Sequence, residues 1–172
     1  DVMGYACLVA IMAMGPGYHR ESQTKLAQVA RAEGAHAAVI SSAGALIATL
    51  QELGLGKVAI LAPYMKPLTQ TVVDYIEAEG IEVCAAHALE ISDNLAVGRR
   101  PPELALNAAA EIDLTGAQAL VLSACVQMPA AAAIEAAEQK FGLPVVTASS
   151  CTVRQMLKAL SVVPIVSGFG AA

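Results

Sequence analysis

Short apolar runs alternate along this chain with segments in which apolar residues recur at helical spacing. Several of the runs are apolar at nearly every position, which is typical of parallel strands that are buried on both faces. The predicted strands are Val2–Ala6, Ala37–Ile40, Val58–Leu61, Glu82–Ala86, Ala119–Leu122 and Pro144–Ala148.

Between these runs, apolar residues three or four positions apart predict amphipathic helices. One such helix carries Leu68, Val72 and Tyr75 on one face, with Pro67 at its start and Gly80 after its end. The other apolar faces are Leu26, Val29 and Ala30; Leu46, Ile47, Leu50 and Leu53; and Val153, Met156, Leu157 and Leu160. Alternating strands and helices predict an α/β fold, in which helices cover both faces of a parallel sheet.

The chain also contains a weak internal repeat. Gly4–Val9 and Leu122–Gln127 each combine the end of a strand with an Ala-Cys pair. Further on, Val39–Ser42 and Val146–Ser150 each end a strand in small hydroxyl residues before a helix. Two matched landmarks in the same order predict two similar α/β halves.

We expect residues 1–43 and 149–172 to form the first half, and residues 44–148 to form the second. Val2–Ala6 begins directly after Asp1 and resembles a strand that is already under way. We therefore expect the first half to lack its N-terminal strand and loop in this sequence.

Composition excludes several classes of partner. The 172 residues are 56% hydrophobic and 15% charged, which is a globular composition. Aromatic residues make up 3%, Trp is absent and the net charge is -5, so a nucleic-acid partner is not expected. The most apolar run, Tyr5–Met14, is too short to cross a bilayer, so no membrane partner is expected.

The four cysteines form no CxxC pair, and the histidines lack metal-ligand spacing, so neither a disulfide framework nor a metal site is predicted. This pattern favours reduced thiols and a cytoplasmic location. We interpret His19, His36 and His87 as surface or structural residues.

Cys7 and Cys125 are the strongest candidates for chemistry. Each is predicted to lie at the carboxyl end of a strand, where open α/β sheets bind ligands, and at the start of a helix, which stabilises a thiolate. A thiolate is both a nucleophile and a base. The alternative is that a free cysteine simply packs as a small apolar residue. We apply that interpretation to Cys84, inside a strand, and to Cys151.

Other polar positions near strand ends are weaker candidates. Tyr64 lies between a strand and a helix and could donate its hydroxyl to a carboxylate, or simply pack on the core. Asn94 lies in a polar turn and could donate its amide to an anion, or form an Asx turn. Arg99–Pro102 resembles a solvated loop, and Gly15–Gly17 lacks the strand-to-helix context of a dinucleotide-binding loop.

Taken together, four segments of the chain resemble the maleate cis–trans isomerase family, in the aspartate/glutamate racemase superfamily. These segments are Ala6–Val9, Ala62–Pro67, Ile91–Val97 and Leu122–Met128. The resemblance implies two flavodoxin-like parallel-sheet halves related by a pseudo-two-fold axis, with the active site between them. It also implies a homodimer or a higher homo-oligomer. The family's N-terminal strand and its asparagine-bearing loop have no counterpart before Asp1.

The resemblance also implies roles for individual residues. Cys7 would be the nucleophile, and Cys125 its partner across the cleft. A substrate carboxylate would be bound by the side chains of Tyr64 and Asn94 and by the backbone N–H groups of Leu8 and Val9.

The implied reaction is isomerisation of maleate, a small dicarboxylate, to fumarate through a succinyl-cysteine-like intermediate, without metal or cofactor. A racemase of amino acids or hydantoins, with the two cysteines as opposed acid/base groups, is the main alternative. A decarboxylase would need only one cysteine. A non-enzymatic α/β binding module is a further alternative.

Overall fold

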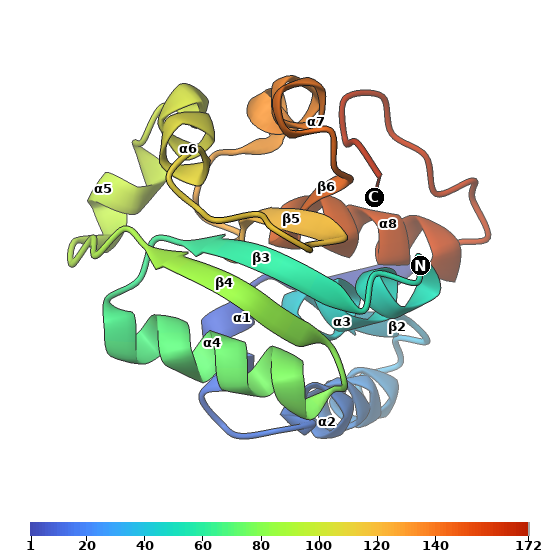
Figure 1. The fold of residues 1–172 in the computed structure, drawn as a ribbon. Coiled ribbons are helices and arrows are strands. Elements are labelled where there is room, and N and C mark those ends of the chain that lie inside the picture. The colour runs from blue at the N-terminus through green and yellow to red at the C-terminus, as the bar shows by residue number, and fades with distance from the viewer. Residues whose placement is uncertain (172) are drawn as a thin grey trace.

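The computed structural model describes residues 1–171 and has the predicted α/β architecture (Figure 1). All six predicted strands are present, with ends within two residues of those expected. The strands are β1 (Val2–Tyr5), β2 (Ala38–Ser41), β3 (Lys57–Ala62), β4 (Glu82–Ala88), β5 (Ala119–Ser123) and β6 (Val145–Thr147). The helices are α1 (Leu8–Met12), α2 (Tyr18–Ala32), α3 (Ser42–Glu52), α4 (Lys66–Ala78), α5 (Asn94–Gly98), α6 (Pro102–Ala109), α7 (Ile134–Phe141) and α8 (Ala148–Ala159), with a 3₁₀ turn, η1 (Ala131–Ala133).

The strands form two separate parallel sheets. β1 pairs with β2, and the second sheet has the order β4-β3-β5-β6. The first sheet thus lies within residues 1–43 and the second within residues 44–148, while the expected division of the whole chain into two halves stays a prediction. The assignment of residues 149–172 to the first half also stays a prediction, and residue 172 lies outside the described residues. The pseudo-two-fold axis stays a prediction as well.

Helices cover both faces of the four-stranded sheet, and β3 shows why. Its side chains alternate: Val58 and Ile60 enter a core shared with α1, α3, α4 and α8, whereas Ala59 and Leu61 enter a core shared with α6 and α7. A strand buried on both faces must be apolar throughout, which accounts for the continuous run in the sequence. Figure 1 shows α6 and α7 on one side of this sheet and α4 on the other.

The short helix α1 joins the first sheet to the core of the second. Leu8, Ile11 and Met12 are each at most 2% exposed and pack in the core that contains α3 and α4. Burial of three such side chains contributes on the order of 1.5–3 kcal/mol each. This anchoring holds the start of α1, and the residue before it, against the larger sheet.

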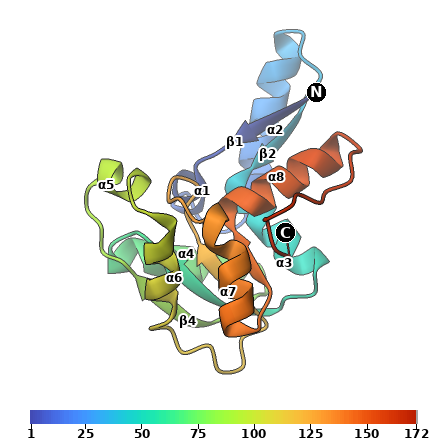
Figure 2. The same ribbon diagram turned by 90° about the horizontal axis from the view of Figure 1, so that it is seen from above.

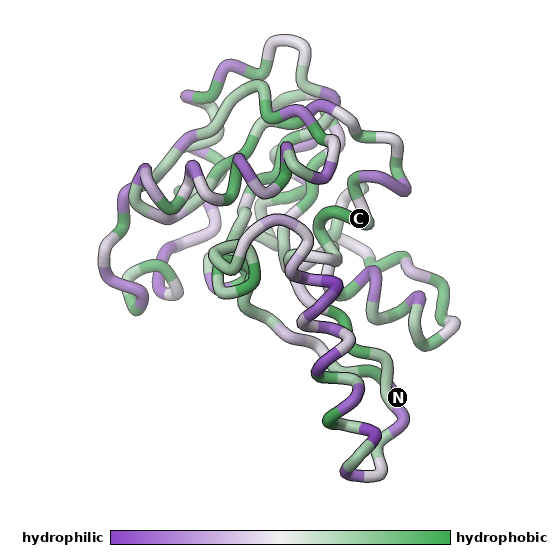
Figure 3. Tube along the Cα trace, turned by 90° about the horizontal axis from the view of Figure 1, so that it is seen from below, coloured by the Kyte–Doolittle hydropathy of each residue, from purple (hydrophilic) through white to green (hydrophobic). Residues whose placement is uncertain are grey.

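The predicted apolar face of α2 is largely exposed, and that of α8 is only partly buried. Leu26 and Val29 of α2 are 40% and 63% exposed, and with Met3 and Tyr5 of β1 they line an open groove of about 330 Å³. β1, β2 and α2 project together from the rest of the molecule (Figure 2). Figure 3 shows hydrophobic and hydrophilic residues alternating along α2. A two-stranded sheet is too narrow to cover the whole stripe, so the helix forms but Leu26 and Val29 stay exposed.

None of the helices described within residues 1–171 is long and apolar enough to cross a bilayer.

Candidate active site

The strand order creates a crevice where β3 and β5 lie side by side. From β3 the chain passes through α4 to β4 on one face of the sheet, and it returns through α6 to β5 on the other face. Connections that diverge to opposite faces leave room beyond the carboxyl ends of the two strands, which is where open α/β sheets bind ligands. Tyr64 follows β3 and Cys125 follows β5 at this point.

The segment that carries Cys125 is a tight loop and not the start of a helix. Ser123, fully buried at the end of β5, donates its hydroxyl to the carbonyl of Cys125 over 2.7 Å and accepts the Cys125 N–H over 3.3 Å. The expectation that a helix begins at Cys125 is wrong, because the chain bends through Val126–Met128 and helical turns start only at Ala131. Pro129 explains the delay, since proline disfavours helical backbone in the residue before it.

Cys7 does lie at a helix start, as predicted. It is the N-cap residue of α1, and its side chain makes no capping hydrogen bond, so the thiol stays free of the helix. Leu8 and Val9 form the first turn, where backbone N–H groups have no partner within the helix. These N–H groups and the thiol therefore lie at the same end of α1.

One cavity brings together all six residues that the sequence singled out. Its volume is about 130 Å³, well below the roughly 300–1,000 Å³ of pockets that hold drug-sized ligands. The lining residues are Ala6, Cys7, Leu8, Val9, Tyr64, Asn94, Cys125, Val126 and Gln127. The space suits a ligand of few heavy atoms, with a thiol from each of two distant parts of the chain.

Tyr64 connects the two sides of this cavity. Its ring packs against the cores on both faces of the sheet, and its hydroxyl donates to the carbonyl of Ala124 over 3.3 Å. Burial raises the pKa of Tyr64, and the neighbouring thiols of Cys125 and Cys7 raise it further because negative charge there opposes a phenolate. Tyr64 is therefore a neutral hydrogen-bond donor at physiological pH.

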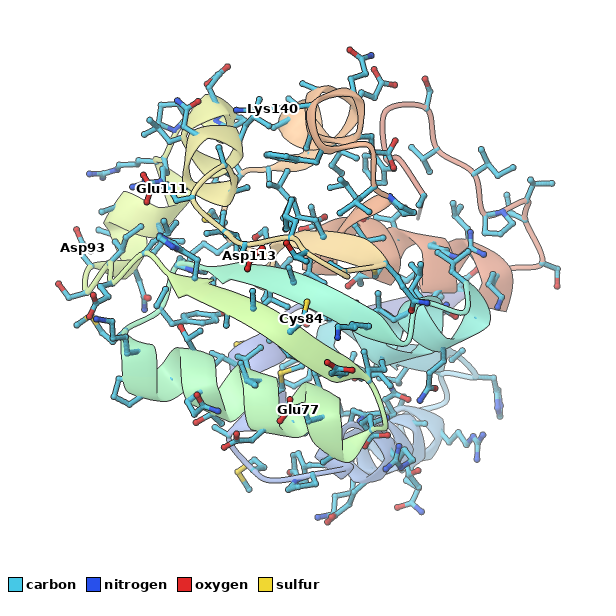
Figure 4. The ribbon with its side chains drawn as sticks, viewed as in Figure 1. Glu77, Cys84, Asp93, Glu111, Asp113 and Lys140 are labelled. Atoms are coloured by element: carbon cyan, nitrogen blue, oxygen red, sulfur yellow. The ribbon has the colours of Figure 1, made fainter. Side chains whose placement is uncertain are left out.

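Asn94 reaches the cavity from the first position of α5. Asp93 caps this helix by accepting the N–H of Leu95 over 2.9 Å, so the predicted polar turn is also a helix start. Figure 4 shows Asp93 at the outer end of the sheet beside α5. Gln127, which sequence reasoning left out of the site, donates its side-chain amide to the carbonyl of Asn94 over 2.6 Å. Its position two residues after Cys125 was the available signal.

The other two cysteines lie outside the cavity. Cys84 lies within β4, away from α5 (Figure 4), and donates its thiol to the carbonyl of Val58 over 3.3 Å. Cys151 is fully buried in the first turn of α8, and burial raises its pKa to about 12. The structure thus separates two thiols that face a cavity from two that pack as small residues.

The histidines also lie apart from the cavity. His19 is buried and bonds through Nδ1 to the hydroxyl of Tyr75 over 2.6 Å, which is a structural role. Within residues 1–171 no three His, Cys, Asp or Glu side chains gather closely enough to hold a metal ion.

Comparison with known proteins identifies relatives of this chain. The model of a family described as arylmalonate decarboxylase matches residues 4–171. The chain is 52% identical over 161 residues to a maleate isomerase of Geobacillus stearothermophilus, covering 94% of this chain and 64% of that relative. A crystal structure of a maleate isomerase from Pseudomonas putida superposes with a TM-score of 0.97 at 50% identity, covering 99% of this chain and 68% of that one.

A third relative has a covalent intermediate in its structure. A cysteine-to-serine mutant of Nocardia farcinica maleate cis–trans isomerase, with a covalently bound succinylcysteine intermediate, matches with a TM-score of 0.96 at 42% identity. The match covers 99% of this chain and 69% of that one. The chain spans about two thirds of the length of the curated relatives that it matches. These findings confirm the resemblance inferred from the sequence segments.

Proposed function

Because the chain belongs to the arylmalonate decarboxylase family, in the branch of the maleate isomerases, we propose that its cavity catalyses cofactor-independent cis–trans isomerisation of maleate to fumarate. The observation that carries the proposal is the small cavity in which the thiols of Cys7 and Cys125 meet the hydroxyl of Tyr64. A four-carbon dicarboxylate suits a space of about 130 Å³.

The chemistry requires the carbon–carbon double bond to become single for a time. The thiolate of Cys7 adds to one olefinic carbon, a carbon–sulfur bond forms, and the π electrons move onto the adjacent carboxylate as an enediolate. Rotation about the new single bond follows. The enediolate then re-forms the double bond and expels the thiolate, so fumarate leaves and Cys7 is regenerated with no proton or electron consumed.

The enediolate carries more negative charge than bound maleate, so donors around it lower the barrier. Tyr64 and the backbone N–H groups of Leu8 and Val9 line the cavity and supply such donors, whereas the Asn94 carboxamide binds a substrate carboxylate equally before and after addition. Tyr64 suits this role because its raised pKa keeps the hydroxyl protonated beside the thiols. Exclusion of water also matters, since a proton delivered to the enediolate would trap a succinyl adduct.

We assign covalent attack to Cys7 and not to Cys125. Cys7 caps α1 with its thiol unengaged, next to backbone N–H groups that can hold a carboxylate. Cys125 lies in a loop fixed by Ser123 and acts as the opposing thiol at the other olefinic carbon. The succinylcysteine seen in the Nocardia enzyme supports a covalent route of this kind.

The assignment is tested by mass spectrometry and NMR. Cys125→Ala incubated with maleate should gain the mass of one dicarboxylate on Cys7, and Cys7→Ser should lose both adduct and turnover, since a hydroxyl is too weak an acid to form the nucleophile. Cys84→Ala and Cys151→Ala are the controls and should retain turnover. An adduct trapped on Cys125 in the unmodified protein would reverse the assignment, and a fully active Cys7→Ser would end it.

Racemisation is the second candidate, because two thiols that face one cavity can also act as opposed acid and base. Incubation of the protein, after chelation, with maleate, aspartate and glutamate separates the two reactions. Fumarate formation supports isomerisation, whereas racemised aspartate with unchanged maleate would overturn it. Tight dicarboxylate binding without turnover would favour a binding module.

We also propose a cellular location and an oligomeric state. A thiolate nucleophile must stay reduced, and all four cysteines are free thiols, so we propose a cytoplasmic location. A homodimer or higher homo-oligomer is proposed from the family resemblance. Sedimentation of the purified protein tests the assembly, and a monomer at micromolar concentration would contradict it.

A further inference from the structure

The helix that carries Asn94 is loosely attached to the rest of the protein. α5 is a single turn, and Val97 is its one buried residue, at 3% exposed. Leu95 is 62% exposed, and Asn94 itself is exposed at the outer end of the sheet. Figures 1 and 2 show α5 protruding at one corner of the molecule. A segment held by so little apolar burial can open locally at low cost in free energy.

Gln127, in the loop after β5, supplies a second attachment. Its Nε2 donates to the backbone carbonyl of Asn94 over 2.6 Å. The same side chain reaches the other end of the turn, where a Cβ placed on Gly98 would lie 3.4 Å from Nε2 and 3.6 Å from Cγ. The side chain of Gln127 therefore spans α5 from its first residue to its last.

The attachment begins in the loop that holds Cys125. Ser123 fixes the backbone of Cys125 through two hydrogen bonds, and Gln127 follows two residues later. A short stretch of backbone thus connects Cys125 to Gln127, whose hydrogen bond to Asn94 continues the connection to α5. Asn94 and Gln127 both line the cavity, so a shift of α5 would move the Asn94 carboxamide relative to Cys125.

We propose that Gln127 is a positioning residue, which holds α5, and with it the Asn94 carboxamide, in register with the two thiols. This proposal rests on the proposed isomerase function of the cavity. Gln127 lines the cavity as well, but it acts by placing Asn94, so its loss should weaken substrate binding and leave the thiol chemistry largely intact.

The test replaces Gln127 by methionine, which keeps the unbranched shape and removes the amide donor. Gln70→Met is the matched control, since the exposed Gln70 on α4 bonds only to Asp74, one turn away. We expect the KM for maleate to rise about tenfold in Gln127→Met, with kcat within about threefold of the parent. This change in KM corresponds to about 1.4 kcal/mol, within the usual range for one hydrogen bond. Gln70→Met should leave both constants unchanged.

A second measurement does not depend on turnover. The bond between Arg99 and Arg100 directly follows α5 and is a site for trypsin, and Arg99 is exposed. Gln127→Met should be cut there faster than the parent and Gln70→Met, as followed by intact-protein mass spectrometry.

The outcomes separate the inference from the function on which it rests. A parent protein that does not convert maleate refutes the isomerase, and trypsin cleavage then still decides whether Gln127 holds α5. Unchanged KM and unchanged cleavage in Gln127→Met would overturn the positioning role. A fall in kcat with KM unchanged would also overturn it, since it would mean that Gln127 acts in the chemical step.

Discussion

Replacing Tyr64 by phenylalanine removes one hydroxyl from the cavity and keeps the ring. That ring packs on the cores of both sheet faces, so the change opens no void. Because burial and the two thiols raise the pKa of Tyr64, its hydroxyl is protonated at neutral pH and can turn from the Ala124 carbonyl to a substrate carboxylate. The substitution therefore tests a single donor.

The size of the effect follows from the charge of the acceptor. A hydrogen bond to a charged group contributes about 1.5–3 kcal/mol, so kcat/KM for maleate should fall about 10- to 150-fold. The effect on stability should be small. The bond from Tyr64 to the carbonyl of Ala124 measures 3.3 Å, which is long for an O–H donor, so its loss should cost less than about 1 kcal/mol.

Tyr75→Phe is the matched control. Tyr75 is 2% exposed, and its hydroxyl accepts the backbone N–H of His19 over 3.0 Å and bonds to His19 Nδ1. Phenylalanine there leaves two buried groups of His19 without this partner, so the free energy of unfolding should fall by about 1–3 kcal/mol. Its kcat/KM should stay that of the parent, because Tyr75 lies outside the cavity. Proton NMR of maleate conversion and urea unfolding measure the two quantities.

Alkaline pH provides a further check on Tyr64. Above pH about 10 an unfolded chain ionises this tyrosine, whereas the folded protein keeps it neutral because its pKa is raised. The folded state therefore loses relative stability as pH rises past that point, and Tyr64→Phe should lose less. The reasoning fails if Tyr64→Phe keeps kcat/KM within twofold of the parent, or if it destabilises the fold as much as Tyr75→Phe.

Two further predictions concern stability. Arg20 donates two hydrogen bonds of 2.8 and 2.9 Å to the Glu79 carboxylate, and they lower the pKa of Glu79 in the folded protein. Their contribution to stability is therefore present above the unfolded-state pKa of Glu79 and is lost as pH falls through its folded-state pKa. Glu79→Gln should lose less stability to urea than the parent below pH about 4.5, and an equal loss in both proteins would refute this. Gly44→Ala should lower the free energy of unfolding by about 1–3 kcal/mol, because the added Cβ would lie 2.9 Å from His19 Cδ2. Gly56→Ala is the control, since its Cβ would lie 3.7 Å from the Gln118 side chain. Equal losses of stability in the two variants would contradict the argument.

The secondary structure was largely predictable because burial sets its pattern. Strands such as β3 and β5 are apolar at nearly every position since both faces are covered, and the α4 stripe is buried where its spacing predicted. Prediction failed where local pattern and tertiary contact diverged. The α2 stripe forms a helix, yet Leu26 and Val29 stay exposed because the two strands beside it are too few to cover them.

The candidate site divides in the same way. Cys7 and Cys125 could be found from a repeated Ala-Cys at two strand ends, and the resemblance to a known family added Tyr64 and Asn94. Which thiol lies at a helix start depended on local backbone: Cys7 is the N-cap residue of α1, whereas Cys125 lies in a loop and helical turns begin only at Ala131.

The sequence by itself determined which segments are strands and helices, because apolar spacing reports burial one residue at a time. It also marked candidate residues for chemistry, which patterns such as the repeated Ala-Cys pair single out. Only the tertiary structure decided that Ser123 fixes the Cys125 loop and that Gln127 bonds to Asn94, 33 positions away. Such contacts depend on the distance and direction between side chains of different elements, and these follow from strand order and helix packing, not from any local pattern.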